Sequence, residues 1–107
     1  MDNNMLRASK RIVIDPGHGG DDPGALKNDI IEKDYTLKIS KYMYDRFKDL
    51  GIPVTLTRDS DITLSPTSRT NRVLNAYGND KDVIVISNHL NAGGGTSFYV
   101  VNSSTGV

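Results

Sequence analysis

The chain has 107 residues, with 13 basic and 13 acidic side chains and a formal net charge of zero, so it is long enough for one domain and is not a protein that coats nucleic acid through bulk charge. The absence of cysteine excludes disulfides, iron–sulfur clusters and thiolate zinc sites. No apolar run approaches the roughly 18 residues of a membrane-spanning helix, and no secretory signal is visible in the polar residues 1–9.

The first half of the chain predicts a strand, a loop and a long helix. The β-branched run at residues 11–14 indicates a buried strand, and the Pro- and Gly-rich residues 15–24 indicate a loop. Apolar side chains then recur at helical spacing from about residue 31 to residue 50, and Gly51 follows where a helix commonly ends. This apolar stripe consists of Tyr35, Ile39, Tyr42, Met43, Phe47 and Leu50. We expect its aromatic residues Tyr35, Tyr42 and Phe47 to be core rather than binding surface.

The second half alternates in the same way. Strands are predicted at residues 53–57, 82–87 and 97–101, a short helix at 67–76, and a turn at the glycines of 93–95. The strand at 82–87 is the most apolar and is expected at the centre of the sheet. This order predicts an α/β fold of three layers, in which helices flank a mostly parallel twisted sheet. We expect one domain at residues 10–107, after the polar segment 1–9.

Three residues are candidate metal ligands. His18 follows the first strand and His89 follows the strand at 82–87, and they are the two histidines of the chain. Parallel strands place such positions at one edge of the sheet. Glu32, the sole glutamate of the chain, begins the long helix. Two histidines and a glutamate form the ligand set of a catalytic zinc with one position open to water, and Asp15 is placed to orient His18.

Each candidate also has a simpler interpretation. A loop histidine is usually polar surface, and a glutamate at a helix start is commonly placed there by the helix dipole. The glycines of residues 17–20 resemble a phosphate-binding loop, but their spacing matches neither the dinucleotide fingerprint nor the P-loop. From the residues alone, a structural α/β domain with incidental histidines therefore stays open.

Four motifs in order resemble the zinc-dependent N-acetylmuramoyl-L-alanine amidases of the Amidase_3 family. Residues 12–25, which read IVIDPGHGGDDPGA, are similar to the opening motif of that family. Glu32 heads a helix, residues 54–58 resemble the family strand that ends in Thr-Arg, and Arg69 or Arg72 fits the arginine of the next helix. Residues 86–92 resemble the Ser-x-His-x-Asn-Ala motif. The resemblance covers residues 10–92, and residues 93–107 do not clearly continue it.

The resemblance implies a zinc-dependent hydrolase that cleaves the amide between N-acetylmuramic acid and L-alanine of the peptidoglycan stem peptide. It implies that His18, Glu32 and His89 bind zinc, and it makes Asn91, Arg58 and Arg69 candidates for substrate binding. The family also uses a second glutamate as general base. This chain has none, so we expect a fold that lacks the C-terminal family elements and has weak activity. The alternative is a zinc-containing wall-binding or regulatory remnant without catalysis.

The same resemblance gives expectations about partners and location. The partner is peptidoglycan, and the site of action is the cell wall, reached either as a phage endolysin made in the cytoplasm or as a mature secreted autolysin. Because loss of the C-terminal elements would uncover one face or edge of the sheet around residues 82–87, where the strand is apolar, we also expect self-association.

Overall fold

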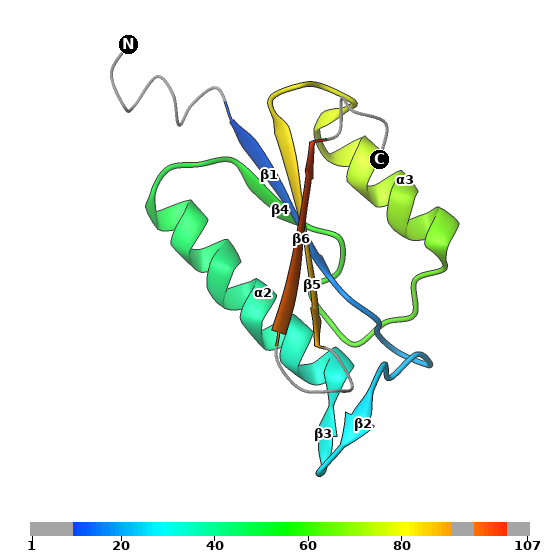
Figure 1. Cartoon of the computed structure of the whole chain (residues 1–107). Helices are drawn as coiled ribbons and strands as arrows, with labels where there is room; N and C mark the ends of the chain where they lie inside the picture. Colours follow the sequence, from blue (N-terminus) through cyan, green and yellow to red (C-terminus); the bar gives the residue numbers. More distant parts are fainter. Residues whose placement is uncertain (1–9, 91–95, 103–107) are drawn as a thin grey trace.

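The computed structural model describes residues 10–90 and 96–102. The predicted segment 1–9, the turn at 93–95 and the end of the chain from 103 lie outside these residues. The elements, in chain order, are β1 (Arg11–Pro16), β2 (Leu26–Lys27), β3 (Ile30–Ile31), α2 (Glu32–Asp49), β4 (Val54–Leu56), α3 (Pro66–Tyr77), β5 (Val83–Leu90) and β6 (Thr96–Asn102). Figure 1 shows the main sheet nearly edge-on, with α2 on one side and α3 on the other.

The main sheet has the order β4-β1-β5-β6. β1 pairs in parallel with β4 and with β5, and β6 pairs with β5 in the antiparallel direction. The predicted fold class is therefore confirmed, with three parallel strands between helices and one antiparallel strand added at the edge. One face or edge of the sheet around residues 82–87 was expected to be uncovered; β5 lies between β1 and β6, so its two edges are both paired.

Alternation along the strands divides the core between two faces. Val13, Val83 and Val85 are buried together, and side chains of α3 pack against them. Ile12 and Ile14 are also buried, and the pleat directs them to the opposite face, on the side of α2.

The buried residues of α2 are polar, and the prediction that the aromatic stripe belongs to the core is wrong for Tyr35 and Tyr42, whereas Phe47 is half-buried. The buried residues are Glu32, Thr36 and Ser40, which recur every four residues and so share one face. Tyr35 and Tyr42 are instead 41% and 69% exposed. The polar face is favourable because its hydroxyls are paired: Thr36 donates to the Gly17 carbonyl at 2.7 Å, and Ser40 accepts from the Asn88 amide at 2.8 Å.

The chain ends α2 as the sequence predicts. The N–H of Gly51 (φ 75°) donates to the Lys48 carbonyl, and the N–H of Ile52 donates to the Phe47 carbonyl. These two bonds form a Schellman motif, which favours glycine at this position. None of the described helices is both long and apolar enough to cross a membrane.

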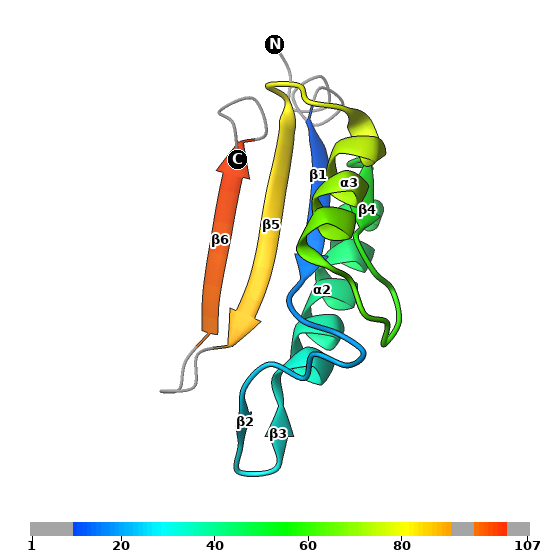
Figure 2. The same ribbon diagram turned by 90° about the vertical axis from the view of Figure 1, so that its right-hand side faces the viewer.

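The small hairpin formed by β2 and β3, which projects below the sheet in Figure 2, was not predicted from the sequence. Its turn residues Asn28 and Asp29 both have positive φ, 52° and 66°. Asparagine and aspartate tolerate this conformation better than most residues, and a two-residue turn of this kind matches the twist of a hairpin. The hairpin leads directly into α2 and so positions Glu32.

Candidate metal centre

The three predicted metal ligands lie at one end of the sheet. His18 is in the loop after β1, His89 is near the end of β5, and Glu32 is the first residue of α2. Figure 2 shows β1 and β5 running toward the end of the molecule where α2 begins. The parallel pairing of β1 with β5 therefore brings together two histidines that are far apart in the sequence.

One atom from each residue faces a common point. The Nε2 atom of His18 lies 3.1 Å from Oε2 of Glu32, and the Nδ1 atom of His89 lies 3.5 Å from the same oxygen. The two imidazole rings meet edge to face, with centroids 5.1 Å apart. One ligand atom from each of the three residues lies within 4.8 Å of the other two, a compact arrangement for a shared metal ion.

Glu32 is held as a carboxylate although it is only 3% exposed. Its Oε1 accepts the N–H of Ala25 and its Oε2 accepts the N–H of Leu90, both at 2.8 Å. Burial raises the pKa of Glu32, but these two hydrogen bonds and the neighbouring imidazoles outweigh burial, so the pKa lies below the ordinary glutamate value. An anion at this position can attract a cation.

Asp22 is the side chain that orients His18. Its Oδ2 lies 2.8 Å from Nδ1 of His18, and its Oδ1 accepts the N–H of Gly24 at 3.1 Å. The hydrogen bond with His18 is the main cause of the lowered pKa of Asp22. With Nδ1–H donated to this carboxylate, the Nε2 lone pair of His18 faces Glu32. His18 and Asp22 thus contact each other within the motif of residues 12–25.

Asp15, which was expected to orient His18, has other partners. It is 7% exposed, and its carboxylate accepts from Thr57 and Ser87, each at 2.8 Å, and from the guanidinium of Arg69. The reason is the pleat of the sheet: Asp15 lies opposite Ser87 in the β1–β5 register and points toward α3.

Two glycines give the histidines room. A Cβ atom at Gly17 would lie 2.6 Å from Cε1 of His89, and a Cβ atom at Gly24 would lie 2.6 Å from Cδ2 of His18. Both distances are too short for a side chain, and Gly24 also has a φ of 70°. From the sequence these glycines were predicted only to be parts of a loop, whereas the structure packs them closely against the two histidines.

The structure places Arg58 and Arg69, the two arginines considered for substrate binding, against the backbone of the His18 loop. Arg58 is 2% exposed and donates to the carbonyls of Gly17 and Lys33 at 3.0 and 3.1 Å. Arg69 donates to the carbonyl of His18 at 3.0 Å. Both guanidinium groups are thus engaged within the protein. Asn91, the third candidate for substrate binding, lies outside the described residues.

A lysine at the start of α2 holds the other side of the same loop. Lys33 donates to the Gly20 carbonyl and to Oδ2 of Asp61, both at 2.9 Å. The hydrogen bond from Lys33, followed by one from the N–H of Gly20, lowers the pKa of Asp61. This ion pair connects α2 to the loop before α3, and the hydrogen bonds of Gly20 with both side chains attach the loop that carries His18.

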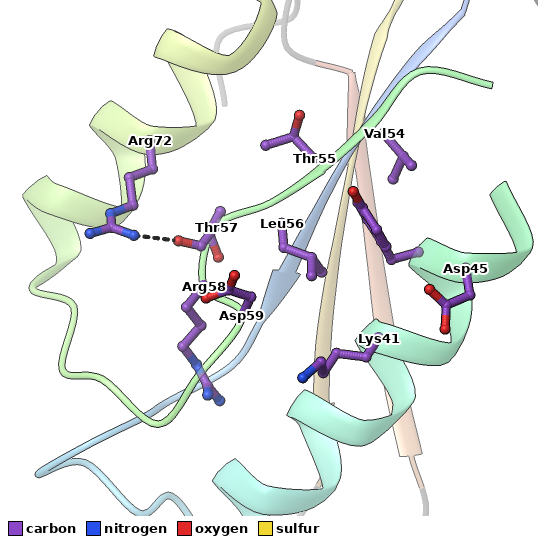
Figure 3. A pocket seen from close by; sticks show the side chains of 10 residues that line it. Lys41, Asp45, Val54, Thr55, Leu56, Thr57, Arg58, Asp59 and Arg72 are labelled. Atoms are coloured by element: carbon purple, nitrogen blue, oxygen red, sulfur yellow. Dashed lines mark hydrogen bonds between the residues drawn. The ribbon is translucent and has the colours of Figure 1, made fainter. Parts of the chain in front are cut away.

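A groove of 490 Å³ lies beside β4, away from the candidate metal centre. Its lining includes Lys41 and Asp45 of α2 and Arg72 of α3, and Figure 3 shows Arg72 donating to the Thr57 carbonyl. The three candidate ligands do not line it, so it is separate from the proposed chemistry.

The donor set fits a divalent metal such as zinc. Two imidazole nitrogens and one carboxylate oxygen converge, and the Nδ1–H of His18 is directed away from the convergence point, toward Asp22. A cation placed between the two imidazole lone pairs and the carboxylate would interact favourably with all three. Two histidines and a glutamate are a known catalytic zinc set.

Comparisons with known proteins show the family of the chain. A model of the N-acetylmuramoyl-L-alanine amidase family matches residues 12–106, so the family pattern continues past residue 92, where the sequence resemblance was expected to end. The N-acetylmuramoyl-L-alanine amidase CwlM of Bacillus licheniformis is 43% identical over 90 residues, which are 82% of this chain and 34% of that protein.

A probable cell wall amidase, LytH of Staphylococcus aureus, is 44% identical over 63 residues, which are 56% of this chain and 22% of that protein. The solved structure of the N-acetylmuramoyl-L-alanine amidase AmiC2 of Nostoc punctiforme superposes with a TM-score of 0.68 at 32% identity, covering 78% of this chain and 45% of that one. The chain spans about a third of the length of the first curated relatives that it matches.

Proposed function

Because the chain belongs to the Amidase_3 family of N-acetylmuramoyl-L-alanine amidases, we propose that it acts on peptidoglycan, at the amide between N-acetylmuramic acid and L-alanine, with a zinc ion held by His18, Glu32 and His89. The observation that carries the proposal is the convergence of Nε2 of His18, Nδ1 of His89 and Oε2 of Glu32. A zinc ion bound there supplies a Lewis acid that activates water and polarises a carbonyl.

The residues around the centre prepare it for binding and substrate access. Glu32 supplies the negative charge, and its two backbone hydrogen bonds keep the carboxylate in place. Asp22 directs the proton of His18 to the far side of the ring. The side chains of His18 and His89 are 25% and 32% exposed, whereas that of Glu32 is 4% exposed. A substrate can therefore approach from the histidine side.

Proton transfer is the step that the described residues support least. Glu32 faces both imidazoles and accepts two backbone hydrogen bonds, so it is committed to the metal position. The Asp22 carboxylate contacts His18 at Nδ1, the ring nitrogen remote from that position. General acid–base help is worth about 10²- to 10⁴-fold in rate. We therefore expect this chain alone to hydrolyse the amide at least about a hundredfold more slowly than a relative with a second glutamate.

The sole glutamate is also the observation that favours the alternative function. A chain that holds zinc and a muramoyl peptide without a positioned base would bind the cell wall without cutting it. In both cases the partner is peptidoglycan and the place of action is the cell wall, as an endolysin or an autolysin.

Self-association is also proposed. Exposed apolar side chains such as Leu26 and Tyr42, which are 66% and 69% exposed, are candidates for the contact between two copies of the chain.

The experiment is the release of new L-alanine amino termini from purified cell walls, with zinc added. We expect slow release by the wild type and none by His89→Ala, the control that removes one ligand. Co-sedimentation with the same walls is measured in parallel. Wall binding with zinc but no amine release would support the alternative, and neither binding nor release would contradict both functions.

A further inference from the structure

Asp15, a buried carboxylate on β1, accepts a hydrogen bond from Ser87, which in turn contacts His89. We propose that Asp15 is a positioning residue that acts through Ser87 to keep the ring proton of His89 on Nε2, so that Nδ1 faces Glu32 without a proton. The inference rests on the proposed metal function of His89. It is tested in the metal-free protein, so its failure is distinguishable from a failure of the proposed activity.

The surroundings of Asp15 are all hydrogen-bond donors. The hydroxyl groups of Thr57 and Ser87 donate to Oδ1 and Oδ2, each at 2.8 Å, and the guanidinium of Arg69 donates to Oδ1. A carboxylate only accepts hydrogen bonds, so this arrangement satisfies it from both sides. Both hydroxyl protons are therefore committed to Asp15.

The single proton of the Ser87 hydroxyl determines what happens at His89. Nε2 of His89 lies 3.2 Å from Oγ of Ser87. Since the hydroxyl proton is donated to Asp15, Oγ can only accept, so its contact with the ring is a hydrogen bond when Nε2 carries the ring proton. The neutral ring then has no proton on Nδ1, the atom that lies 3.5 Å from Oε2 of Glu32. This is the protonation state that a metal ligand needs.

The sheet register explains why these three residues meet. Asp15 and Ser87 are direct partners in the parallel β1–β5 pair. His89 lies two residues beyond Ser87 and therefore points to the same face of the sheet. Arg69 holds both ends of the arrangement, because it donates to Asp15 and also to the carbonyl of His18 at 3.0 Å. The positions of both histidines thus depend on one partly buried ion pair.

Asp15→Asn gives a directional test. The amide oxygen must face the donors Thr57 and Arg69, so the amide NH₂ faces Ser87 and donates to it. The Ser87 proton then turns to Nε2 of His89, and the ring proton moves to Nδ1. Ser87→Ala removes the relay and leaves neither tautomer enforced. Thr57→Val is the matched control, because it removes one donor to Asp15 but keeps the Asp15–Ser87–His89 contacts.

The readout is the His89 tautomer, measured by ¹H–¹⁵N NMR of the imidazole in EDTA at about pH 8, where histidine side chains in general are neutral. We expect the Nε2–H form in the wild type and Thr57→Val, the Nδ1–H form in Asp15→Asn, and a mixture in Ser87→Ala. Zinc affinity should fall about 10- to 100-fold in Asp15→Asn and stay within about threefold in Thr57→Val.

Several results would overturn the inference. A wild type with the proton on Nδ1 would do so without any variant, and this measurement is available even if Asp15→Asn fails to fold. An Asp15→Asn protein that folds and retains Nε2–H would also overturn it, whatever its zinc affinity. A tautomer change in Thr57→Val would assign the effect to general loosening of the sheet.

Discussion

Replacing Glu32 with glutamine tests the most buried ligand of the centre. Both carboxylate oxygens accept backbone hydrogen bonds, from Ala25 and from Leu90. The glutamine side chain has only one oxygen, so its NH₂ group must face one of these N–H donors. A buried donor left without an acceptor costs about 1–3 kcal/mol. We expect Glu32→Gln to lower the free energy of unfolding by about this amount in metal-free solution.

Zinc should increase the difference in the free energy of unfolding between the wild type and Glu32→Gln. A ligand that binds only the folded state stabilises it by RT ln(1 + [L]/Kd), which is about 2.7 kcal/mol at one hundred times Kd. The wild type should gain this stabilisation, whereas Glu32→Gln should not, because the neutral amide is a poor zinc ligand. The difference in the free energy of unfolding should therefore rise to about 4–6 kcal/mol.

The assay is urea unfolding of both proteins, once in EDTA and once with free zinc at one hundred times the wild-type Kd. Asp34→Asn is the control, because Asp34 is an exposed carboxylate in the same first turn of α2 and should change both values by less than about 0.5 kcal/mol. Equal stability of wild type and Glu32→Gln in EDTA would refute the hydrogen-bond argument. A difference that zinc does not widen would refute the metal assignment.

Three further predictions concern the residues that support the centre. Gly24→Ala should abolish zinc binding. Gly51 is also at positive φ but has no atom within 4 Å of a new Cβ, so Gly51→Ala should lower the free energy of unfolding by about 1–2 kcal/mol and leave zinc binding intact. Calorimetry measures the zinc affinity of both variants, and equal affinities would contradict the packing argument. The hydrogen bond from Lys33 lowers the pKa of Asp61 in the folded protein below its ordinary value of 3.8. The ionised Asp61 therefore stabilises the fold at pH values above this ordinary pKa, and the stabilisation is lost as the pH falls through the lower, folded-state pKa. Thermal melts from pH 6 to pH 2 should therefore show the wild type losing more stability than Asp61→Asn, and parallel curves would contradict the ion pair. Arg58→Lys should lower the free energy of unfolding by at least about 2 kcal/mol, because buried carbonyls lose their donors. Arg72→Lys should lower it by less than about 1 kcal/mol. Urea titration measures both values, and equal values would contradict the structural role of the Arg58 hydrogen bonds.

Most of the fold could be predicted because its strands and helices have clear local patterns. The β-branched run of β1 and the glycine after α2 have local causes, and both predictions are confirmed. The inward face of α2 could not be predicted from hydrophobicity, because Thr36 and Ser40 are buried through hydrogen bonds to Gly17 and Asn88, on segments far from α2 in the sequence. The short hairpin has its signal in two turn residues, and no apolar alternation accompanies it.

The proximity of the three candidate ligands could be predicted, but the contacts that hold them could not. His18, Glu32 and His89 could be named from strand ends and motif order, and the structure brings them together. Asp22, and not Asp15 as predicted, contacts His18, whereas Asp15 contacts Ser87. Which aspartate contacts His18 depends on the direction in which each side chain leaves the backbone. That direction follows from the β1–β5 register and from the positive φ of His18, 65°. Neither can be read from residue spacing.

The most direct test of the central claim is the zinc content of the purified protein, measured by elemental analysis after dialysis against buffer at neutral pH. Wild type, His18→Ala, Glu32→Gln and His89→Ala are compared, with Asp34→Asn as the control. We predict about one zinc per chain in the wild type and the control, and a large loss in each of the three ligand variants. A wild type that holds no more zinc than His89→Ala would contradict the assignment of these residues as a metal centre.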